Sequence, residues 1–419
     1  MTALIVTLYL AFFLAQLAVE TGLAVANLRH VARAGDAVPA LLLGHVDNET
    51  ARRSHAYTLA RGRYGLVHGF YAAALILLLL FSGALPAIDA ALARHGLSGA
   101  HRFVGFLVAL SAVPSLANLP FSLYGTFVLE HRFGFNRTTA RLWLKDSVKG
   151  IALSAVIGVP LLYAAYGLFA LTGHAWWLWL FALLTAVQVF MVWLYPLVIA
   201  PLFNKFAPLP DGELRARLEA MARAAGFRAR GLLVMDASRR SGHSNAYFTG
   251  FFRPRIILFD TLVQQMSVDE TAAVLAHEIG HYQARHVHKR LVVGLAVQLA
   301  SLWLLSLLMR WPPLFAAFGF AAPSFHAALA LVSLCGGAFT FFFAPLESYL
   351  SRRHEYEADR YSVAIAGAPV ALRSALVKLN GQNLSNLHPH PWYSAWHYSH
   401  PTLVERLAAI ERAGAATRP

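Results

Sequence analysis

The stretch His277-Glu278-Ile279-Gly280-His281 is the most specific motif of this chain. It has the pattern H-E-x-x-H inside a proline-free segment rich in alanine and aliphatic residues, which predicts a helix. Side chains four residues apart lie on one helix face, so His277 and His281 can bind a single metal ion. Glu278 then lies beside that ion, where its carboxylate can accept a proton from water. Because a five-residue pattern with two free positions also arises by chance, the metal site needs support from elsewhere in the chain.

The residues before this helix predict its start and a small sheet. Ser267 is the expected N-cap, and Glu270 completes an S-x-x-E capping box. Further upstream, the pattern predicts an amphipathic helix at residues 211–226. It also predicts three strands, at 231–235, 244–249 and 256–259, and a turn at 250–254 joins the last two. The strand at 244–249 is short and its successor can pair on one side only, so we expect it at a sheet edge. Its unpaired backbone groups, including the amide of Ala246, can then bond an extended peptide.

The composition of the chain is that of an integral membrane protein. Charged residues make up 13% of the 419 residues, about half the ~25% typical of soluble domains. Hydrophobic residues make up 58%, and Cys335 is the single cysteine, which excludes disulfides within the chain. Seven stretches are long and apolar enough to span a bilayer: 3–27, 64–86, 103–129, 149–172, 176–200, 291–309 and 325–347.

Basic residues in the loops predict the orientation of these spans. The loop after the first span is rich in arginine, including Arg61, and the loops after the third and fifth spans and the C-terminal segment are also basic. The remaining loops carry few basic residues, so the N-terminus is expected outside and the segments 201–290 and 348–419 in the cytoplasm. In a bacterium this would be the inner membrane. The net charge of +14 then reflects contact with the lipid bilayer surface, and we predict no nucleic-acid partner.

Spans and loops divide the chain into four segments. Residues 1–200 form a membrane domain with five spans, and 201–290 form a cytoplasmic metallopeptidase segment with the small sheet. Residues 291–350 form a two-span hairpin, and 351–419 form a C-terminal segment with the third metal ligand. Polar residues inside spans are costly unless they face partners or water. Taken singly they predict interhelical hydrogen bonds, and together they indicate a wet interior; they are Gln16, Glu20, Asn118, Gln188, Gln298 and Glu347.

Three carboxylates after the last span are candidates for the third metal ligand. A hydrolytic zinc site needs three protein ligands and one open position. Glu355, Glu357 and Asp359 follow His281 after two spans, an even number that returns the chain to the same membrane face. Position alone leaves the choice among the three open, and Asp359 can instead fix the tautomer of a ligand histidine. The alternative is a solvated acidic face that pairs with neighbouring arginines.

His400 and Arg406 near the C-terminus are further candidates. A histidine and an arginine can stabilise a developing oxyanion or hold the carboxylate of the third ligand. The residues alone favour a simpler interpretation, an ordinary capped surface helix with Pro401 near its first turn.

These motifs resemble the type I CAAX prenyl proteases, which are integral membrane zinc metallopeptidases with seven spans. The resemblance covers nearly the whole chain and rests on 119–122, 130–136, 244–250, 277–281, 355–359, and His400-Pro401 with Arg406. The first two segments are specific to this family, since related heat-shock-type membrane proteases have a shorter membrane part. The resemblance implies a mainly α fold, with seven transmembrane helices around a water-filled chamber and a small α+β metallopeptidase domain.

The resemblance also implies a role for each matching residue. His277, His281 and Glu355 would bind one Zn²⁺ per chain, Glu278 would be the general base, and Asp359 would support the ligands.

Three further residues take roles from the resemblance. Asn245 would help hold the substrate backbone, and His400 and Arg406 would line the site, where His400 is our candidate for oxyanion stabilisation. Glu357 replaces a neutral residue that is common at its place in the family.

The sequence thus predicts a membrane-embedded zinc metalloendopeptidase that cleaves peptide bonds near the C-terminus of prenylated peptides. Its expected partners are a peptide or protein substrate and the bilayer. One alternative is a quality-control protease of broad specificity for membrane proteins. Another is a non-catalytic scaffold or transporter with structural zinc, although such a closed site needs four ligands and no base.

Overall fold

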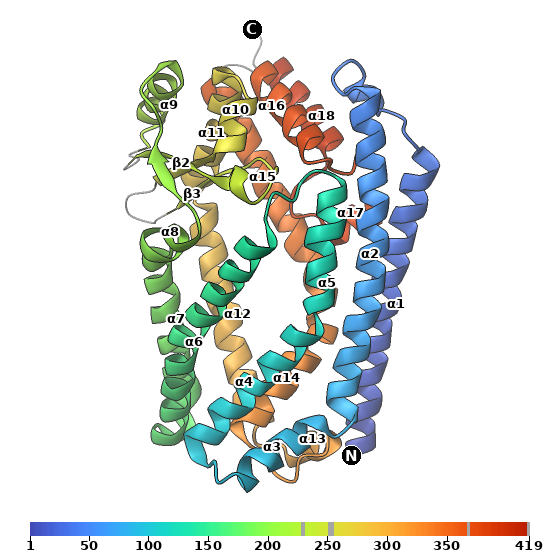
Figure 1. Ribbon diagram of the computed structural model, residues 1–419, viewed down its shortest axis with the longest axis vertical. Coiled ribbons are helices and arrows are strands. Elements are labelled where there is room, and N and C mark those ends of the chain that lie inside the picture. The colour runs from blue at the N-terminus through green and yellow to red at the C-terminus, as the bar shows by residue number, and fades with distance from the viewer. Residues whose placement is uncertain (228–230, 250–254, 367–368, 417–419) are drawn as a thin grey trace.

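The computed structural model describes residues 1–227, 231–249, 255–366 and 369–416 (Figure 1). The predicted turn at 250–254 lies outside the described residues. The fold is mainly α-helical, as predicted, with one small sheet near the end of the molecule that holds the C-terminus.

The described chain has seven helical stretches long and apolar enough to cross a membrane, which agrees with the predicted number. Less than a third of the most apolar part of each is buried inside the protein, so their side chains offer a large apolar surface to lipid. The main helices are α1 (Thr2–Ala34), α2 (Asn48–Phe81), α4 (Gly99–Ala117), α6 (Ala140–Leu171), α7 (Trp176–Leu194), α12 (His286–Leu308) and α14 (Phe325–Thr340).

Several predicted span bounds differ from the helices, because helices continue past the apolar stretch into water. The predicted span 64–86 belongs to α2, which begins at Asn48 and places Arg61 inside a helix where a loop was expected. Helix α2 ends at Phe81, because Gly83 adopts φ 80°, and α3 (Ala84–Arg94) begins directly after it. The predicted span 103–129 is interrupted after α4, where α5 (Leu119–Tyr124) and a π-helical segment (Gly125–Glu130) follow.

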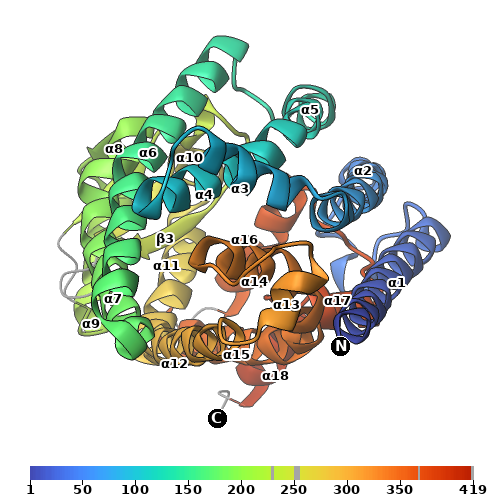
Figure 2. The same cartoon turned by 90° about the horizontal axis from the view of Figure 1, so that it is seen from below.

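The long helices stand around the long axis of the molecule, and Figure 2 shows them as a ring seen from below. The N-terminus lies at one end, near the short helices α3 and α13 (Pro312–Ala317). The opposite end carries the C-terminus and the shorter helices α9 (Glu213–Ala224), α10 (Asp260–Gln265), α11 (Val268–Gln283), α16 (Pro369–Gln382) and α18 (Leu403–Ala416). Short α8 (Ala200–Phe203) leads from α7 towards the sheet, and short α17 (Pro391–His397) packs on α1 and α15.

The sheet has four strands in the order β1-β2-β4-β3. The strands are β1 (Phe206–Pro208), β2 (Leu232–Met235), β3 (Ala246–Thr249) and β4 (Arg255–Phe259). β1 was not predicted from the sequence, because three residues give no alternation to detect. Strand β3 pairs with β4 alone among the described strands, so the predicted edge position is correct.

Helix α11 carries the H-E-x-x-H stretch and packs on α15 (Ala344–Ala366), the helix that continues from the last span. The capping box forms as predicted: the amide of Glu270 donates to the Ser267 hydroxyl at 3.2 Å, and the amide of Ser267 donates to the Glu270 carboxylate at 2.8 Å. Gly280 sits at the crossing of the two helices. A Cβ there would lie 3.0 Å from the Cα of Ala358 and 3.1 Å from its carbonyl oxygen.

We predict that Gly280→Ala separates α11 from α15 and destabilises the protein by about 1–3 kcal/mol, as overpacking typically does. The clash is with main-chain atoms of Ala358, which cannot rotate away. The matched control is Gly294→Ala in α12, where an added Cβ meets no described atom within 4 Å. Thermal unfolding should show a lowered Tm for the first variant and an unchanged or raised Tm for the second, because alanine favours a helix more than glycine does. Equal melting temperatures for both variants would contradict this account of the crossing.

Candidate metal centre

Helices α11 and α15 bring two histidines and one of the three candidate carboxylates together. The Nε2 atoms of His277 and His281 are 3.2 Å apart. The Glu355 carboxylate lies 3.4 Å from Nε2 of His277 and 3.3 Å from Nε2 of His281. His277 and Glu355 are buried, and His281 is nearly so. Among the described residues, this trio is the one group of histidines, cysteines and carboxylates arranged to hold a metal ion.

The spacing of these three donors fits zinc. Zinc–ligand bonds of about 2.0–2.1 Å in a tetrahedron place neighbouring ligand atoms about 3.3 Å apart. The two Nε2 atoms, and each Nε2 with the Glu355 oxygen nearest to it (Oε2 for His277, Oε1 for His281), are separated by distances within about 0.1 Å of that value. Two imidazoles and one carboxylate are also the donor set of open, hydrolytic zinc sites, which leave a fourth position for water or substrate.

The other two carboxylates of the 355–359 segment contact the ligand histidines from behind, one directly and one through a further histidine. Asp359 lies 2.9 Å from Nδ1 of His277, the nitrogen on the opposite side of the ring from the metal-facing Nε2. Burial alone would lower the pKa of His277, but the hydrogen bonds to Asp359 and Glu355 raise it to about 9. In turn, Arg406 contacts both oxygens of Asp359, at 2.6 and 2.9 Å. Arg406 thus neutralises the buried carboxylate that orients His277.

The second ligand histidine has a different support, which the sequence analysis missed. Nδ1 of His281 lies 2.9 Å from Nδ1 of His286, a buried residue. Nε2 of His286 lies 3.0 Å from the Glu357 carboxylate, and its ring stacks on His354 with the ring centres 4.0 Å apart. A metal on Nε2 of His281 leaves the proton on Nδ1, so His286 accepts there and donates to Glu357. The clustering of histidines after the motif was the available signal for this chain of contacts.

Glu278 lies between the two ligand histidines in sequence and is partly buried. Burial raises the pKa of its carboxyl above the usual range. A carboxylate with a raised pKa is a stronger proton acceptor, which suits it to general-base chemistry.

His400 lies on the open side of the centre. Its Nδ1 is 2.7 Å from the Glu355 carboxylate, and 63% of its side chain is exposed. Of the two roles considered for this histidine, holding the third-ligand carboxylate is the one this contact supports.

The edge strand β3 has backbone groups that do not pair with β4. The amide of Phe259 donates to the carbonyl of Asn245 at 3.1 Å, which makes these two residues a hydrogen-bonded pair. By alternation, the backbone groups of Ala246 and Phe248 face away from β4. The amide of Ala246 donates instead to the side chain of Asn245 at 2.8 Å, so a substrate carbonyl must compete with that contact.

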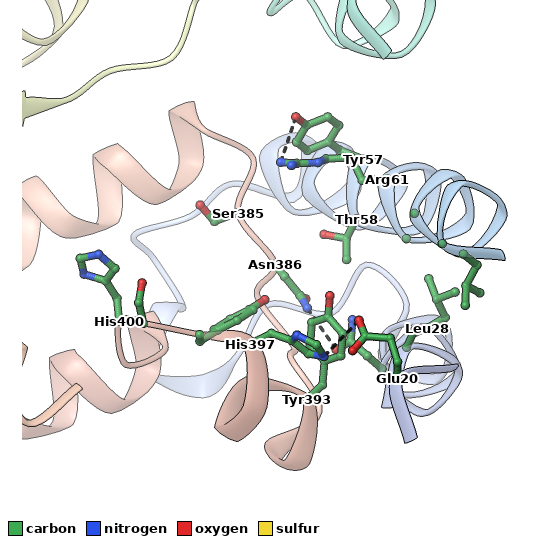
Figure 3. A pocket seen from close by; sticks show the side chains of 18 of the residues that line it. Glu20, Leu28, Tyr57, Thr58, Arg61, Ser385, Asn386, Tyr393, His397 and His400 are labelled. Atoms are coloured by element: carbon green, nitrogen blue, oxygen red, sulfur yellow. Dashed lines mark hydrogen bonds and ion pairs between the residues drawn. The ribbon is translucent and has the colours of Figure 1, made fainter. Parts of the chain in front are cut away.

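A cavity of about 1200 Å³ lies between the helices (Figure 3), and Asn245 and Phe259 at the sheet are among the residues that line it. Asn245, His400 and Arg406 line it at the metal centre. Gln16 and Glu20 of α1 line it within the membrane helices, which agrees with the wet interior indicated by polar residues in the spans.

Comparisons with known proteins agree with this geometry. A family model described as the CAAX prenyl protease N-terminal region with five membrane helices matches residues 27–205, and one for peptidase family M48 matches residues 208–413. CAAX prenyl protease 1 homolog of Arabidopsis thaliana is 37% identical over 89% of this chain and 90% of its own length. CAAX prenyl protease 1 of Saccharomyces cerevisiae is 36% identical, covering 89% of this chain and 88% of the relative.

A solved structure is similar over almost the whole chain. The crystal structure of S. mikatae Ste24p superposes with a TM-score of 0.87 at 34% identity, covering 96% of this chain and 97% of the other. Fold, donor set and matches together define the class, a zinc-dependent metallopeptidase embedded in a membrane. Within that class, the chain belongs to the CAAX prenyl protease family, in peptidase family M48. Membership in a peptidase family decides against the non-catalytic scaffold considered above.

We predict that His286→Phe weakens zinc binding by roughly 10- to 100-fold, since loss of the support behind a ligand histidine typically has this effect. The variant keeps an aromatic ring but removes the acceptor for Nδ1 of His281. His286→Asn restores an acceptor near that position and should recover most of the affinity. Glu357→Gln keeps a hydrogen-bond acceptor for His286, so its zinc affinity should fall less than that of His286→Phe.

Competition with a chelator of known affinity measures the zinc dissociation constant of each variant. Thermal unfolding of the zinc-free proteins checks that all of them fold. Wild-type zinc affinity in a folded His286→Phe variant would remove His286 from the support of the centre.

Proposed function

We propose that this protein hydrolyses peptide bonds near the C-terminus of prenylated CAAX-type peptides. The observation that carries the peptidase part is that the Nε2 atoms of His277 and His281 and the Glu355 carboxylate approach one another to 3.2–3.4 Å, with Glu278 beside them. The substrate class comes from the relatives, which are named as CAAX prenyl proteases. A cavity of about 1200 Å³ with both apolar and polar walls is large enough for a lipidated peptide.

In this proposal His277, His281 and Glu355 hold one zinc ion. Bound zinc supplies Lewis-acid chemistry, which polarises the peptide carbonyl and acidifies the attacking water. Glu278 takes the proton of that water and passes it to the leaving amine. Its raised pKa, caused by burial, makes it a stronger acceptor for that proton.

The surrounding residues keep the centre in place. Asp359 holds His277 in the tautomer that offers Nε2 to the metal, and Arg406 balances the charge of Asp359. His400 lies with Nδ1 2.7 Å from the Glu355 carboxylate, and its exposed ring can rotate towards the oxyanion that forms on the substrate.

The substrate is proposed to lie along β3 as an added strand. The outward-facing groups of Ala246 and Phe248 would bond its backbone. Asn245 would release the amide of Ala246 and use its own carboxamide as a clamp on the peptide. A quality-control protease of broad specificity would use the same strand, so the edge does not favour either substrate class.

We also propose that the centre faces the cytoplasm and the N-terminus the outside. Support comes from the basic loops and from the ends of the chain, which lie at opposite ends of the molecule as an odd number of spans requires (Figure 1). The four segments predicted from the sequence are proposed as functional units and not as separately folded domains, because the boundaries at 290 and 350 fall inside α12 and α15.

Glu278→Gln should abolish cleavage while zinc stays bound. Loss of a general base typically lowers the rate by about 10²–10⁴-fold, and the glutamine side chain is nearly isosteric with the native glutamate. The measurement pairs cleavage of a farnesylated peptide with metal analysis of the same purified sample. Cleavage at the wild-type rate by the zinc-loaded variant would rule out Glu278 as the base.

Single cysteines test the orientation after Cys335→Ala removes the native thiol. His174→Cys and Pro323→Cys, at exposed positions in two of the three loops of low charge, should react with an impermeant reagent in intact cells. Asp211→Cys, exposed at the end that holds the metal centre, should react only after the membrane is opened. The reverse pattern would place the centre outside and contradict the proposed orientation.

A further inference from the structure

The cavity beside the metal centre contains a cation without a carboxylate partner. Among the described residues, the acidic and basic side chains that line it, histidines aside, are Glu20, Arg61 and Arg406. Arg406 is bound to both oxygens of Asp359, and Glu20 lies 3.8 Å from Nε2 of His397. Arg61 makes no ion pair with any described residue. Its charge acts at a distance on the Glu130 carboxylate, which the Tyr57 hydroxyl contacts, but no carboxylate of the described residues is in direct contact with it.

The surroundings of Arg61 leave its guanidinium available. Its one hydrogen bond to a described residue is long, 3.5 Å, to the hydroxyl of Tyr57. That hydroxyl already donates to Glu130 at 2.7 Å, so it accepts from Arg61 without neutralising it. The guanidinium lies 5.5 Å from the centre of the Tyr57 ring, and its side chain is exposed to the cavity.

Arg61 and the metal centre border the same space. Figure 3 shows Arg61 and Tyr57 on α2 at one wall, and Tyr393 and His397 on α17 at the facing wall. His400, which contacts Glu355, lines the same cavity. A peptide held at the metal centre can thus extend towards Arg61 without leaving the cavity.

The proposed substrate brings a negative charge into this space. A peptide cut near its C-terminus carries a free α-carboxylate only a few residues beyond the scissile bond. Three extended residues span about 10 Å, at about 3.3 Å each. A carboxylate taken from bulk water needs a partner, and a guanidinium binds it through two parallel hydrogen bonds.

We propose that Arg61 binds the free C-terminal carboxylate of the substrate and acts as its anchor. The distance from Arg61 to the metal centre then fixes how many residues lie between the cleaved bond and the C-terminus. The inference rests on the proposed function, because it assumes a substrate cleaved near its C-terminus. It adds a specificity determinant on α2, which is far in sequence from the metal ligands and does not touch the reacting bond.

The test compares two farnesylated peptides that differ only in ending as a free acid or a C-terminal amide. The proteins are wild type, Arg61→Gln, Arg61→Lys and the control Arg63→Gln, whose position on α2 is exposed and outside the described cavity lining. All are assayed in phosphatidylcholine vesicles without anionic lipid, so that the headgroup of an anionic lipid cannot bind the arginine, and again in vesicles that contain phosphatidylglycerol. Zinc content and Tm establish that each variant is folded and loaded.

In wild type, amidation should lower kcat/KM by roughly 10- to 100-fold, the usual range for losing a charged hydrogen-bonded partner. Arg61→Gln should reduce this acid-to-amide ratio to below about threefold, mainly by slowing cleavage of the acid. Arg61→Lys should keep part of the ratio, and Arg63→Gln all of it. Two residues added after the natural C-terminus should slow the wild type and leave Arg61→Gln unaffected.

Two results overturn the anchor while the proposed function stands: equal cleavage of acid and amide by wild type, or an unchanged ratio in Arg61→Gln. An Arg61 effect that requires anionic vesicles also overturns it, since the arginine would then bind a lipid phosphate. Failure of wild type to cleave either farnesylated peptide, while it cleaves an unprenylated peptide, refutes the proposed substrate class and the anchor with it.

Discussion

The close crossing of α11 and α15 at Gly280 is the constraint on which the metal centre depends. It sets Ala358 against the backbone of α11, within one turn of both ligand histidines. Glu355 and Asp359, on the same face of α15, then reach His277 from two sides, at Nε2 and Nδ1. A longer helix separation would open the donor spacing beyond the about 3.3 Å expected for zinc. The absence of a Cβ at Gly280 is therefore a condition for the donor geometry of the centre.

The two histidines of the centre have different hydrogen-bond partners at Nδ1, and this difference affects how strongly each Nε2 can donate to a metal. His277 has a carboxylate behind it that is held by Arg406. His281 has a neutral imidazole between it and Glu357. Direct contact with a carboxylate makes an imidazole a stronger donor than contact through a second ring. Zinc held by these residues, as we propose, would have unequal imidazole donors, with the better donor on the side of the buried ion pair.

Local patterns were enough to predict the seven spans, the capping box at Ser267 and the edge strand, because each depends on residues close in sequence. The even number of spans between His281 and Glu355 correctly placed them on one face, but the choice of Glu355 over Glu357 needed the helix register. His286 and Arg61 were missed as functional candidates. Their neighbours come from other helices, and Arg61 was assigned to a loop because hydropathy ends before the helix does. The assigned catalytic roles remain predictions.

The zinc K-edge X-ray absorption spectrum of the purified, zinc-loaded protein tests the central claim most directly. The account predicts one zinc per chain with two imidazole nitrogens, one carboxylate oxygen and one further oxygen at about 2.0–2.2 Å. It also predicts that Glu355→Ala loses the carboxylate contribution together with most of the bound metal. Three or more imidazoles around the zinc, or a spectrum unchanged in Glu355→Ala, would contradict the account.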